Sequence, residues 1–277
     1  MSRYCLLVFV LLFTGCTNFL FVPVKPFPVT PEEADTRYED IYLSTRDGLK
    51  LHGWKLYADT EKTQGKVKGT ILFFHGNGDN VSTQLPNTFW LVKEGYDLYV
   101  FDYREYGLSQ GEANLDYTIT DLELMMAYVA GQLADDEKFI VLGHSLGGAM
   151  AIYAVAHSAY RDKIEALITL AAFSDYHDVT QDVLSTSWLL WLFQWPLSFT
   201  VDNSYRPLDS IGLIAPLPVM IIHGKKDEII PIYHADRLFS AANEPKQFAL
   251  IDSDHSNVLI SKENRQVLSD YLKTLNH

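Results

Sequence analysis

Short apolar runs alternate with longer helix-like segments from residue 39 to the end of the chain. Runs of this length, bounded by glycine and polar residues, are typical of buried strands. The first two runs flank R-D-G at 46–48, which predicts a hairpin. The runs that predict about eight strands lie at 39–44, 51–57, 70–74, 98–101, 139–142, 164–171, 219–223 and 247–251.

The segments between these runs have the periodicity of helices. In one of them, Leu122, Met125 and Val129 form an apolar stripe. Strands that alternate with helices predict an α/β fold, in which a mostly parallel sheet is covered by helices on both faces. Sites in such sheets form beyond the carboxyl ends of the strands, so chemistry is expected just after residues 74, 142, 223 and 251. The predicted helices lie at 82–94, 115–133, 146–159 and 262–275.

Composition and charge exclude several classes of protein. Hydrophobic residues make up 48% of the 277 residues and charged residues 21%, which is typical of a globular chain with one sizeable core. The net charge of −13 repels phosphate backbones, so nucleic acid is not an expected partner. Because both cysteines, Cys5 and Cys16, lie at the N-terminus, a disulfide scaffold and a Cys-rich metal site are excluded. Neither H-E-x-x-H nor a glycine-rich nucleotide loop occurs, so we predict no metal and no cofactor.

One predicted strand end carries the motif G-x-S-x-G. The segment G-H-S-L-G at 143–147 follows the run at 139–142 and precedes a small-residue helical segment. In this strand–turn–helix context the glycines allow a close approach of strand and helix, and the turn exposes the hydroxyl of the central serine, Ser145. The motif predicts Ser145 as a nucleophile.

A serine nucleophile needs a base to take its proton and a carboxylate to orient that base. His255 follows the last predicted strand on a polar loop, and Asp227 lies one loop after the run at 219–223. The chain order Ser, Asp, His is the order that this architecture requires. Asp175, after the run at 164–171, is an alternative acid, although Asp227 lies in the better motif.

With these segments, the chain resembles the α/β-hydrolase superfamily over residues 39–275. Within it, the chain is similar to the serine aminopeptidase group (peptidase family S33) and to the BEM46-like and ABHD13/ABHD17-like proteins. Two departures are Glu105, where these families usually have glycine, and N-G-D-N at 77–80 in place of the more frequent N-A-G-N. Besides the three triad segments, the matching segments are T-R-D-G at 45–48, L-H-G-W at 51–54, F-H-G-N-G at 74–78 and D-Y-R-E-Y-G-L-S-Q-G at 102–111.

The resemblance implies an oxyanion hole and a cap. Two backbone N–H groups should face the carbonyl oxygen of the tetrahedral intermediate, one from Leu146 and one from Asn77. Hydrolases of this family usually carry a helical cap after the sixth strand, which corresponds here to about 173–212. Its tryptophans form the core of the cap, line an acyl substrate or face lipid, and these alternatives stay open at this stage. They are Trp188, Trp191 and Trp195.

The N-terminus predicts an export signal. Residues 1–15 hold a short basic start, an apolar run at 4–13 and T-G before Cys16. This resembles a bacterial lipoprotein signal, which implies that Cys16 becomes the lipid-bearing first residue, although that family prefers leucine at the position of Phe13. An uncleaved anchor is the alternative.

The lipoprotein resemblance also implies a location in the bacterial cell envelope. Thr17, a residue other than Asp after the cysteine, implies the outer membrane, with the protein facing the periplasm. The proline-rich stretch at 16–38 predicts either a stiff tether or an arm packed on the body, and the hydrolase domain is expected at 39–277.

Together these features predict a serine hydrolase that cleaves acyl esters or thioesters through an acyl-enzyme. Its expected partners are a small acyl substrate and the membrane that holds its lipid anchor. An S33-like peptidase and a non-catalytic, lipid-anchored binding protein are the alternatives, since intact parts prove neither substrate nor turnover. The oligomeric state stays open.

Overall fold

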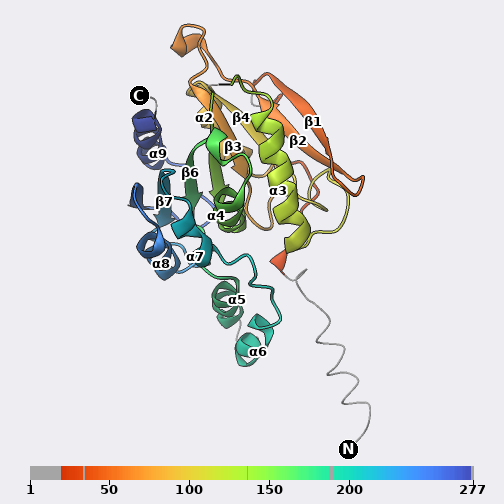
Figure 1. Ribbon diagram of the computed structural model, residues 1–277, viewed down its shortest axis with the longest axis vertical. Helices are drawn as coiled ribbons and strands as arrows, with labels where there is room; N and C mark the ends of the chain where they lie inside the picture. Colours follow the sequence, from red (N-terminus) through yellow and green to blue (C-terminus); the bar gives the residue numbers. More distant parts are fainter. Residues whose placement is uncertain (1–19, 34, 136, 187–189, 276–277) are drawn as a thin grey trace, which may run out of the picture.

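A single eight-stranded sheet forms the centre of the computed structural model, which describes residues 20–33, 35–135, 137–186 and 190–275 (Figure 1). The strand order is β1-β2-β4-β3-β5-β6-β7-β8. The strand β2 runs antiparallel to both of its neighbours, and every other pair is parallel. The strands are β1 (Tyr38–Ser44), β2 (Lys50–Leu56), β3 (Gly69–Phe74), β4 (Tyr96–Phe101), β5 (Phe139–His144), β6 (Ile164–Leu170), β7 (Val219–Gly224) and β8 (Lys246–Ile251).

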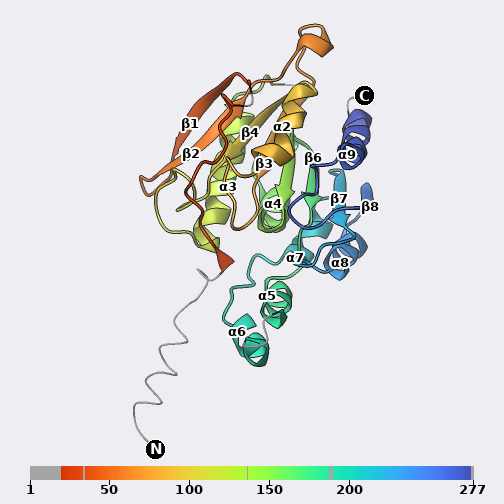
Figure 2. The ribbon, with the colours of Figure 1, turned by 180° about the vertical axis from the view of Figure 1, so that it is seen from behind.

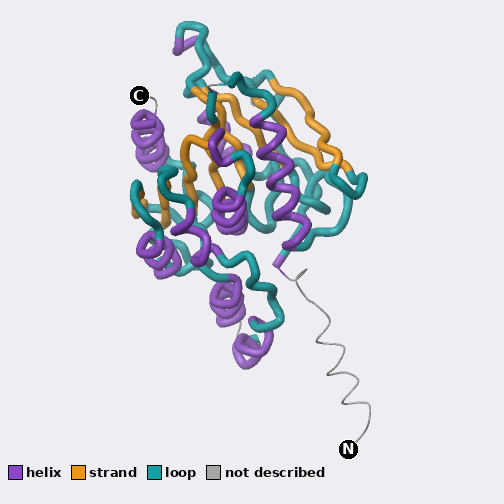
Figure 3. Tube along the Cα trace, in the orientation of Figure 1, coloured by secondary structure: helices purple, strands orange, loops and turns teal. Residues whose placement is uncertain are grey.

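Helices cover both faces of this sheet, as Figures 2 and 3 show. The helices α3, α4 and α8 contribute to one hydrophobic core cluster, and α2 and α9 contribute to the other. The mostly parallel α/β fold predicted from the sequence is therefore confirmed. The helices named here are α2 (Leu85–Lys93), α3 (Leu115–Ala130), α4 (Leu146–His157), α7 (Pro207–Ser210), α8 (Tyr233–Ala241) and α9 (Lys262–Leu275).

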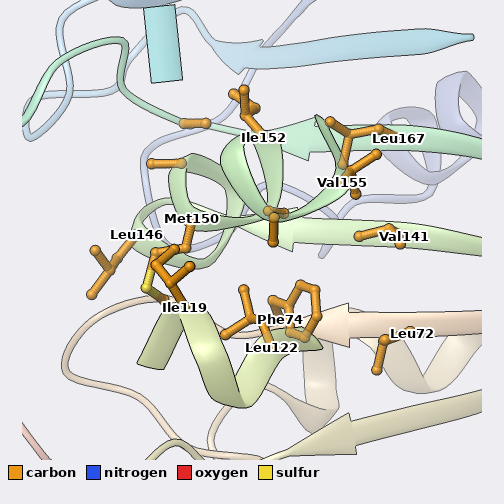
Figure 4. Close-up of a cluster of buried hydrophobic side chains, with 14 of the residues drawn as sticks. Leu72, Phe74, Ile119, Leu122, Val141, Leu146, Met150, Ile152, Val155 and Leu167 are labelled. Carbon is orange, nitrogen blue, oxygen red and sulfur yellow. The ribbon is translucent and has the colours of Figure 1, made fainter. Parts of the chain in front are cut away.

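The central strands are buried on both faces, which explains why they read as continuous apolar runs. In β3, Leu72 and Phe74 belong to the core beneath α3 and α4, whereas Ile71 and Phe73 belong to the core beneath α2 and α9. Figure 4 shows the first of these cores, with Phe74 beside Leu122 of α3. Because β3, β5, β6, β7 and β8 pair in parallel, the carboxyl ends of these strands lie at one edge of the sheet.

The helix α8 was not predicted, because it is only nine residues long and its segment Y-H-A-D-R-L-F-S-A is short for a helical period to be recognised. The helix α2 begins at Leu85, three residues later than expected, because proline occupies its first turn and residues 81–84 form turns before it.

Between β6 and β7 the chain leaves the sheet and forms the expected helical insert. The helices α5 (Tyr176–Ser185) and α6 (Gln194–Ser198) lie beyond the sheet, at one end of the molecule in Figure 1. After them, α7 and the 3₁₀ helix η5 (Ile211–Leu213) return to the body, where Ile211 is buried in the core.

The proline-rich segment packs on the body over residues 20–31. Val29 exchanges hydrogen bonds with Ser82, and the ring of Phe27 lies 5.5 Å from that of Trp54. Of the two alternatives for this segment, the structure shows the packed arm. Cys16 and the expected signal at 1–15 lie outside the described residues, so the lipoprotein signal stays a prediction. No helix in the described ranges is long and apolar enough to cross a membrane.

Candidate active site

The serine motif forms a sharp turn between β5 and α4. Ser145 has φ 51° and ψ −117°, a strained backbone conformation that residues other than glycine rarely adopt. The turn is possible because its neighbours are glycines. A Cβ atom at Gly147 would lie 2.4 Å from the main-chain oxygens of Phe74 and His75, and one at Gly143 would lie 2.6 Å from the Cα atom of Gly148.

The structure brings the three predicted triad side chains together. The Nε2 atom of His255 lies 3.0 Å from the Oγ atom of Ser145, and its Nδ1 atom lies 2.8 Å from Oδ2 of Asp227. A carboxylate only accepts hydrogen bonds, so Nδ1 of His255 carries the proton and Nε2 is free to accept one from the serine hydroxyl. This tautomer is the one that a general base requires.

The carboxylate of Asp227 is held ionised. Burial raises its pKa, but the hydrogen bond from His255 and the backbone N–H groups of Ile230 and Ile229 outweigh burial, so the pKa lies below its usual value. Both N–H groups donate to Oδ1, at 2.8 Å from Ile230 and 3.0 Å from Ile229, which leaves Oδ2 for the histidine. The loop after β7 therefore fixes the orientation of the acid.

The alternative acid, Asp175, serves another purpose. One of its oxygens accepts the backbone N–H groups of His177 and Asp178 and so caps α5, and the other pairs with Arg206. Its side chain is committed to the cap, away from His255.

A second histidine, His144, lies beside the triad. Its Nε2 atom donates to the backbone oxygen of His255 at 2.9 Å, and its ring is stacked obliquely on that of His255 with centroids 5.1 Å apart. Burial, together with repulsion from a charged His255, lowers the pKa of His144 from 6.5 to about 4. His144 is therefore neutral in the folded protein and supports the His255 loop as a hydrogen-bond donor.

This low pKa predicts an acid-sensitive fold. Below pH 6.5 the unfolded chain binds a proton at His144 that the folded chain does not bind until about pH 4, so the free energy of unfolding falls across this range. We expect the variant His144→Gln to lose about 2 kcal/mol less stability than the wild type between pH 7 and pH 5, at 1.36 kcal/mol for each pKa unit. Urea unfolding at the two pH values measures the difference, and an equal loss in both proteins would contradict it.

A cavity of about 280 Å³ opens beside Ser145. Its walls are mainly apolar, and both expected oxyanion residues, Asn77 and Leu146, line it. Leu146 is the first residue of α4, so its N–H group has no acceptor within the helix. The residues that line the cavity are Leu20, Asn77, Asp79, His144, Ser145, Leu146, Phe173, Val179, Thr180, Val183, Ile229, Ile230, His255 and Ser256.

The N-terminal arm forms part of this site, which the sequence did not indicate. Leu20 lines the cavity, and the backbone N–H of Val22 donates to the side-chain oxygen of Asn77 at 2.7 Å. The same oxygen accepts the hydroxyl of Tyr106 at 2.7 Å and the N–H of Gly78 at 3.0 Å. Three donors thus fix the loop that carries the expected oxyanion residue.

The expected cap tryptophans occupy a different place. Trp188 lies outside the described residues, and Trp191 and Trp195 are more than half exposed and do not line the cavity. The expectation that they line the substrate or form a cap core is therefore wrong for Trp191 and Trp195. The cavity wall comes instead from α5, through Val179, Thr180 and Val183.

A second Ser–His–Asp arrangement fastens α5 to the body. Nδ1 of His234 lies 2.9 Å from the Oγ atom of Ser174, and Nε2 lies 2.9 Å from Oδ2 of Asp182 in α5. Ser174 and His234 are fully buried, so no substrate reaches this hydroxyl. The arrangement is a structural link between α8 and the cap, strengthened by the ion pair of Arg237 with Asp178.

The departure at Glu105 has a local explanation. Its φ angle is 71°, in the left-handed region that glycine adopts without strain. The carboxylate accepts the backbone N–H of Ala113 at 3.1 Å, which ties the turn to the start of the next segment.

Comparison with known proteins finds a matching family, similar sequences and a similar solved structure. The family described as serine aminopeptidase, S33, matches residues 65–208. YfhR of Salmonella typhi is 30% identical over 247 residues, which cover 86% of this chain and 80% of that protein. The protein bem46 of Schizosaccharomyces pombe is 30% identical over 251 residues, with 88% and 79% covered. Among solved structures, the esterase Pf2001 of Pyrococcus furiosus superposes with a TM-score of 0.73 at 21% identity, covering 93% of this chain and 98% of that one.

Proposed function

Because the chain belongs to the serine aminopeptidase, S33, family of α/β hydrolases, we propose that it is a serine hydrolase of carboxylic esters or thioesters. The observation that carries the proposal is the continuous hydrogen-bonded line from Asp227 through His255 to Ser145, at the wall of an apolar cavity. This line supplies a nucleophile, a base and an orienting acid in the geometry that acyl transfer needs.

The proposed reaction has two halves. The Oγ atom of Ser145 attacks the acyl carbon while Nε2 of His255 takes the hydroxyl proton, and the backbone N–H groups of Leu146 and Asn77 stabilise the oxyanion. The imidazolium then gives its proton to the leaving alcohol or thiol, which departs and leaves the acyl group on Ser145. Water attacks this ester with His255 again as the base, and the carboxylic acid leaves. Asp227 remains a carboxylate throughout and stabilises the imidazolium.

The cavity favours an acyl substrate. Its lining includes Phe173, Val179 and Ile230, which present no charge to the bound group. A cavity of about 280 Å³ is at the small end of ligand sites, which suits a short or medium acyl chain, or part of a longer one.

A panel of chromogenic substrates tests this proposal. We expect hydrolysis of p-nitrophenyl esters to rise from acetate toward medium acyl chains, because each buried CH₂ adds roughly 0.8 kcal/mol until the cavity is full. Acyl thioesters belong in the same panel. Activity on none of them, with an intact fold by circular dichroism, would contradict the proposal and favour the non-catalytic binding protein.

One observation favours a peptidase as the second candidate. Asp79 lines the cavity, where its carboxylate could hold a free amine, and its orientation is fixed by Thr83 at 3.0 Å and Gln84 at 2.6 Å. An aminoacyl p-nitroanilide distinguishes the two candidates. Faster cleavage of this amide than of any acyl ester, together with its loss in Asp79→Asn, would favour the peptidase.

A further inference from the structure

The cap exposes a large apolar surface. Between Asp182 and Asp202 the sequence carries no charged residue. Within this segment, six large apolar side chains of residues 190–199 are between 38% and 71% exposed. We call them the cap patch. They are Leu190, Trp191, Leu192, Phe193, Trp195 and Phe199.

The cap patch lies on a firmly held support. Gln181 of α5 donates to Ser198 of α6 at 3.1 Å, and the ring of His177 lies 5.5 Å from that of Phe199. The helix α5 is in turn fastened to the body by the His234–Asp182 and Arg237–Asp178 contacts. The exposed cap patch is therefore carried by a segment that is anchored to the body through α5 and α6.

The apolar surface continues from the cap patch to the active-site cavity. Val183 of α5 is 45% exposed and also lines the cavity, as does the half-exposed Ile229. Leu20 lines the same cavity, so the described chain begins at its mouth. Figures 1 and 2 both show this start of the chain at the same end of the molecule as α5 and α6, away from α9.

We propose that the cap patch docks on a lipid surface and that the active site draws its acyl substrate from it. Tryptophan and phenylalanine on an uncharged segment are the side chains that enter the boundary between headgroups and acyl chains. The residues that precede Leu20 include the apolar run at 4–13. Only the origin of the substrate rests on the proposed hydrolase function; docking is independent of turnover.

Charge specifies the kind of lipid. The net charge is −13, and the cap patch is flanked by Asp182 and Asp202. An anionic membrane repels such a face, so the proposed surface is zwitterionic. We expect docking on phosphatidylcholine vesicles and weaker docking when an anionic lipid is added.

Quenching by brominated phosphatidylcholine tests the docking in the full chain. Trp54 and Trp90 are buried in the body, so bromine at the headgroup boundary quenches the tryptophans of the cap segment. We expect quenching in the wild type and in Ser145→Ala. The double variant Leu192→Glu/Phe199→Glu should weaken it roughly tenfold in lipid concentration, because both charges would have to enter the apolar boundary. Because residues 1–19 are retained in every variant, a difference in quenching between variants reports the cap rather than attachment through the N-terminus.

A control variant matches the change in charge. Val67 and Leu213 are 49% and 54% exposed and lie ahead of β3 and β7, at the amino ends of the strands. Val67→Glu/Leu213→Glu should keep the quenching. Leu192→Glu/Phe199→Glu should also keep the hydrolysis of a soluble short-chain ester while it loses roughly tenfold on an acyl ester embedded in vesicles.

Three results would overturn the proposal. Absence of quenching in the wild type means that lipid does not reach the cap patch, as when residues 1–19 cover it. A dimer that Leu192→Glu/Phe199→Glu converts to a monomer in lipid-free gel filtration assigns the cap patch to a second copy. Equal quenching in both double variants would show that docking does not depend on the cap patch. Loss of all ester hydrolysis with normal quenching contradicts the proposed function and leaves the docking intact.

Discussion

Ser145→Ala should lower kcat for ester hydrolysis by about 10³- to 10⁶-fold, because it removes the atom that forms the acyl-enzyme. The oxyanion N–H groups and the cavity remain, so KM should change little and a slow residual rate should persist. Labelling by a fluorophosphonate probe, which reacts with an activated serine hydroxyl, should disappear in the same variant. Steady-state kinetics and gel-based detection of the label measure the two effects.

Ser158→Ala is the matched control. It makes the same substitution next to the other end of α4, where the hydroxyl accepts the backbone N–H of Tyr160 at 3.0 Å. Its kinetics and labelling should equal those of the wild type. Labelling that survives in Ser145→Ala would show that another residue is the nucleophile.

Asp227→Asn should lower kcat by roughly 10³- to 10⁴-fold at neutral pH. The amide of asparagine can donate to Nδ1 of His255, which moves the imidazole proton to Nε2 and prevents that atom from accepting the proton of Ser145. The carboxylate that stabilises the imidazolium is lost in the same change. Steady-state kinetics on the best ester of the panel measure the loss.

Asp175→Asn separates the two candidate acids. The asparagine can still cap α5 through His177 and Asp178, whereas the ion pair with Arg206 and the hydrogen bond from Asn203 to the other oxygen are lost. We expect less than a tenfold change in kcat, since a partly exposed pair contributes about 1 kcal/mol or less. A larger loss in Asp175→Asn than in Asp227→Asn would assign the acid to the loop after β6.

The triad segments could be predicted because each of the three residues lies within four positions of the end of a strand. Ser145, Asp227 and His255 lie close in sequence to β5, β7 and β8. The sheet aligns the carboxyl ends of these strands and so brings the three residues together. The strand–turn–helix motif is equally local. Most of the fold and the expected site residues were therefore readable from short windows of sequence.

The cavity walls could not be predicted, because they depend on contacts between distant segments. Nothing near Val22 indicates that its N–H group will meet Asn77, 55 positions away. The density of aromatic residues at 188–199 likewise does not show which side of the cap they occupy. Part of the lining comes from Val179 and Val183, one turn apart on α5, a helix whose sequence is mostly polar.

The packed arm links the position at which the chain begins to the shape of the cavity. A chain that starts at Cys16 keeps Leu20 in the cavity wall and Val22 on Asn77. A chain cut beyond Val24 loses both, together with the contact of Val24 with Gly107. A cut within the arm would thereby also change the width of the pocket.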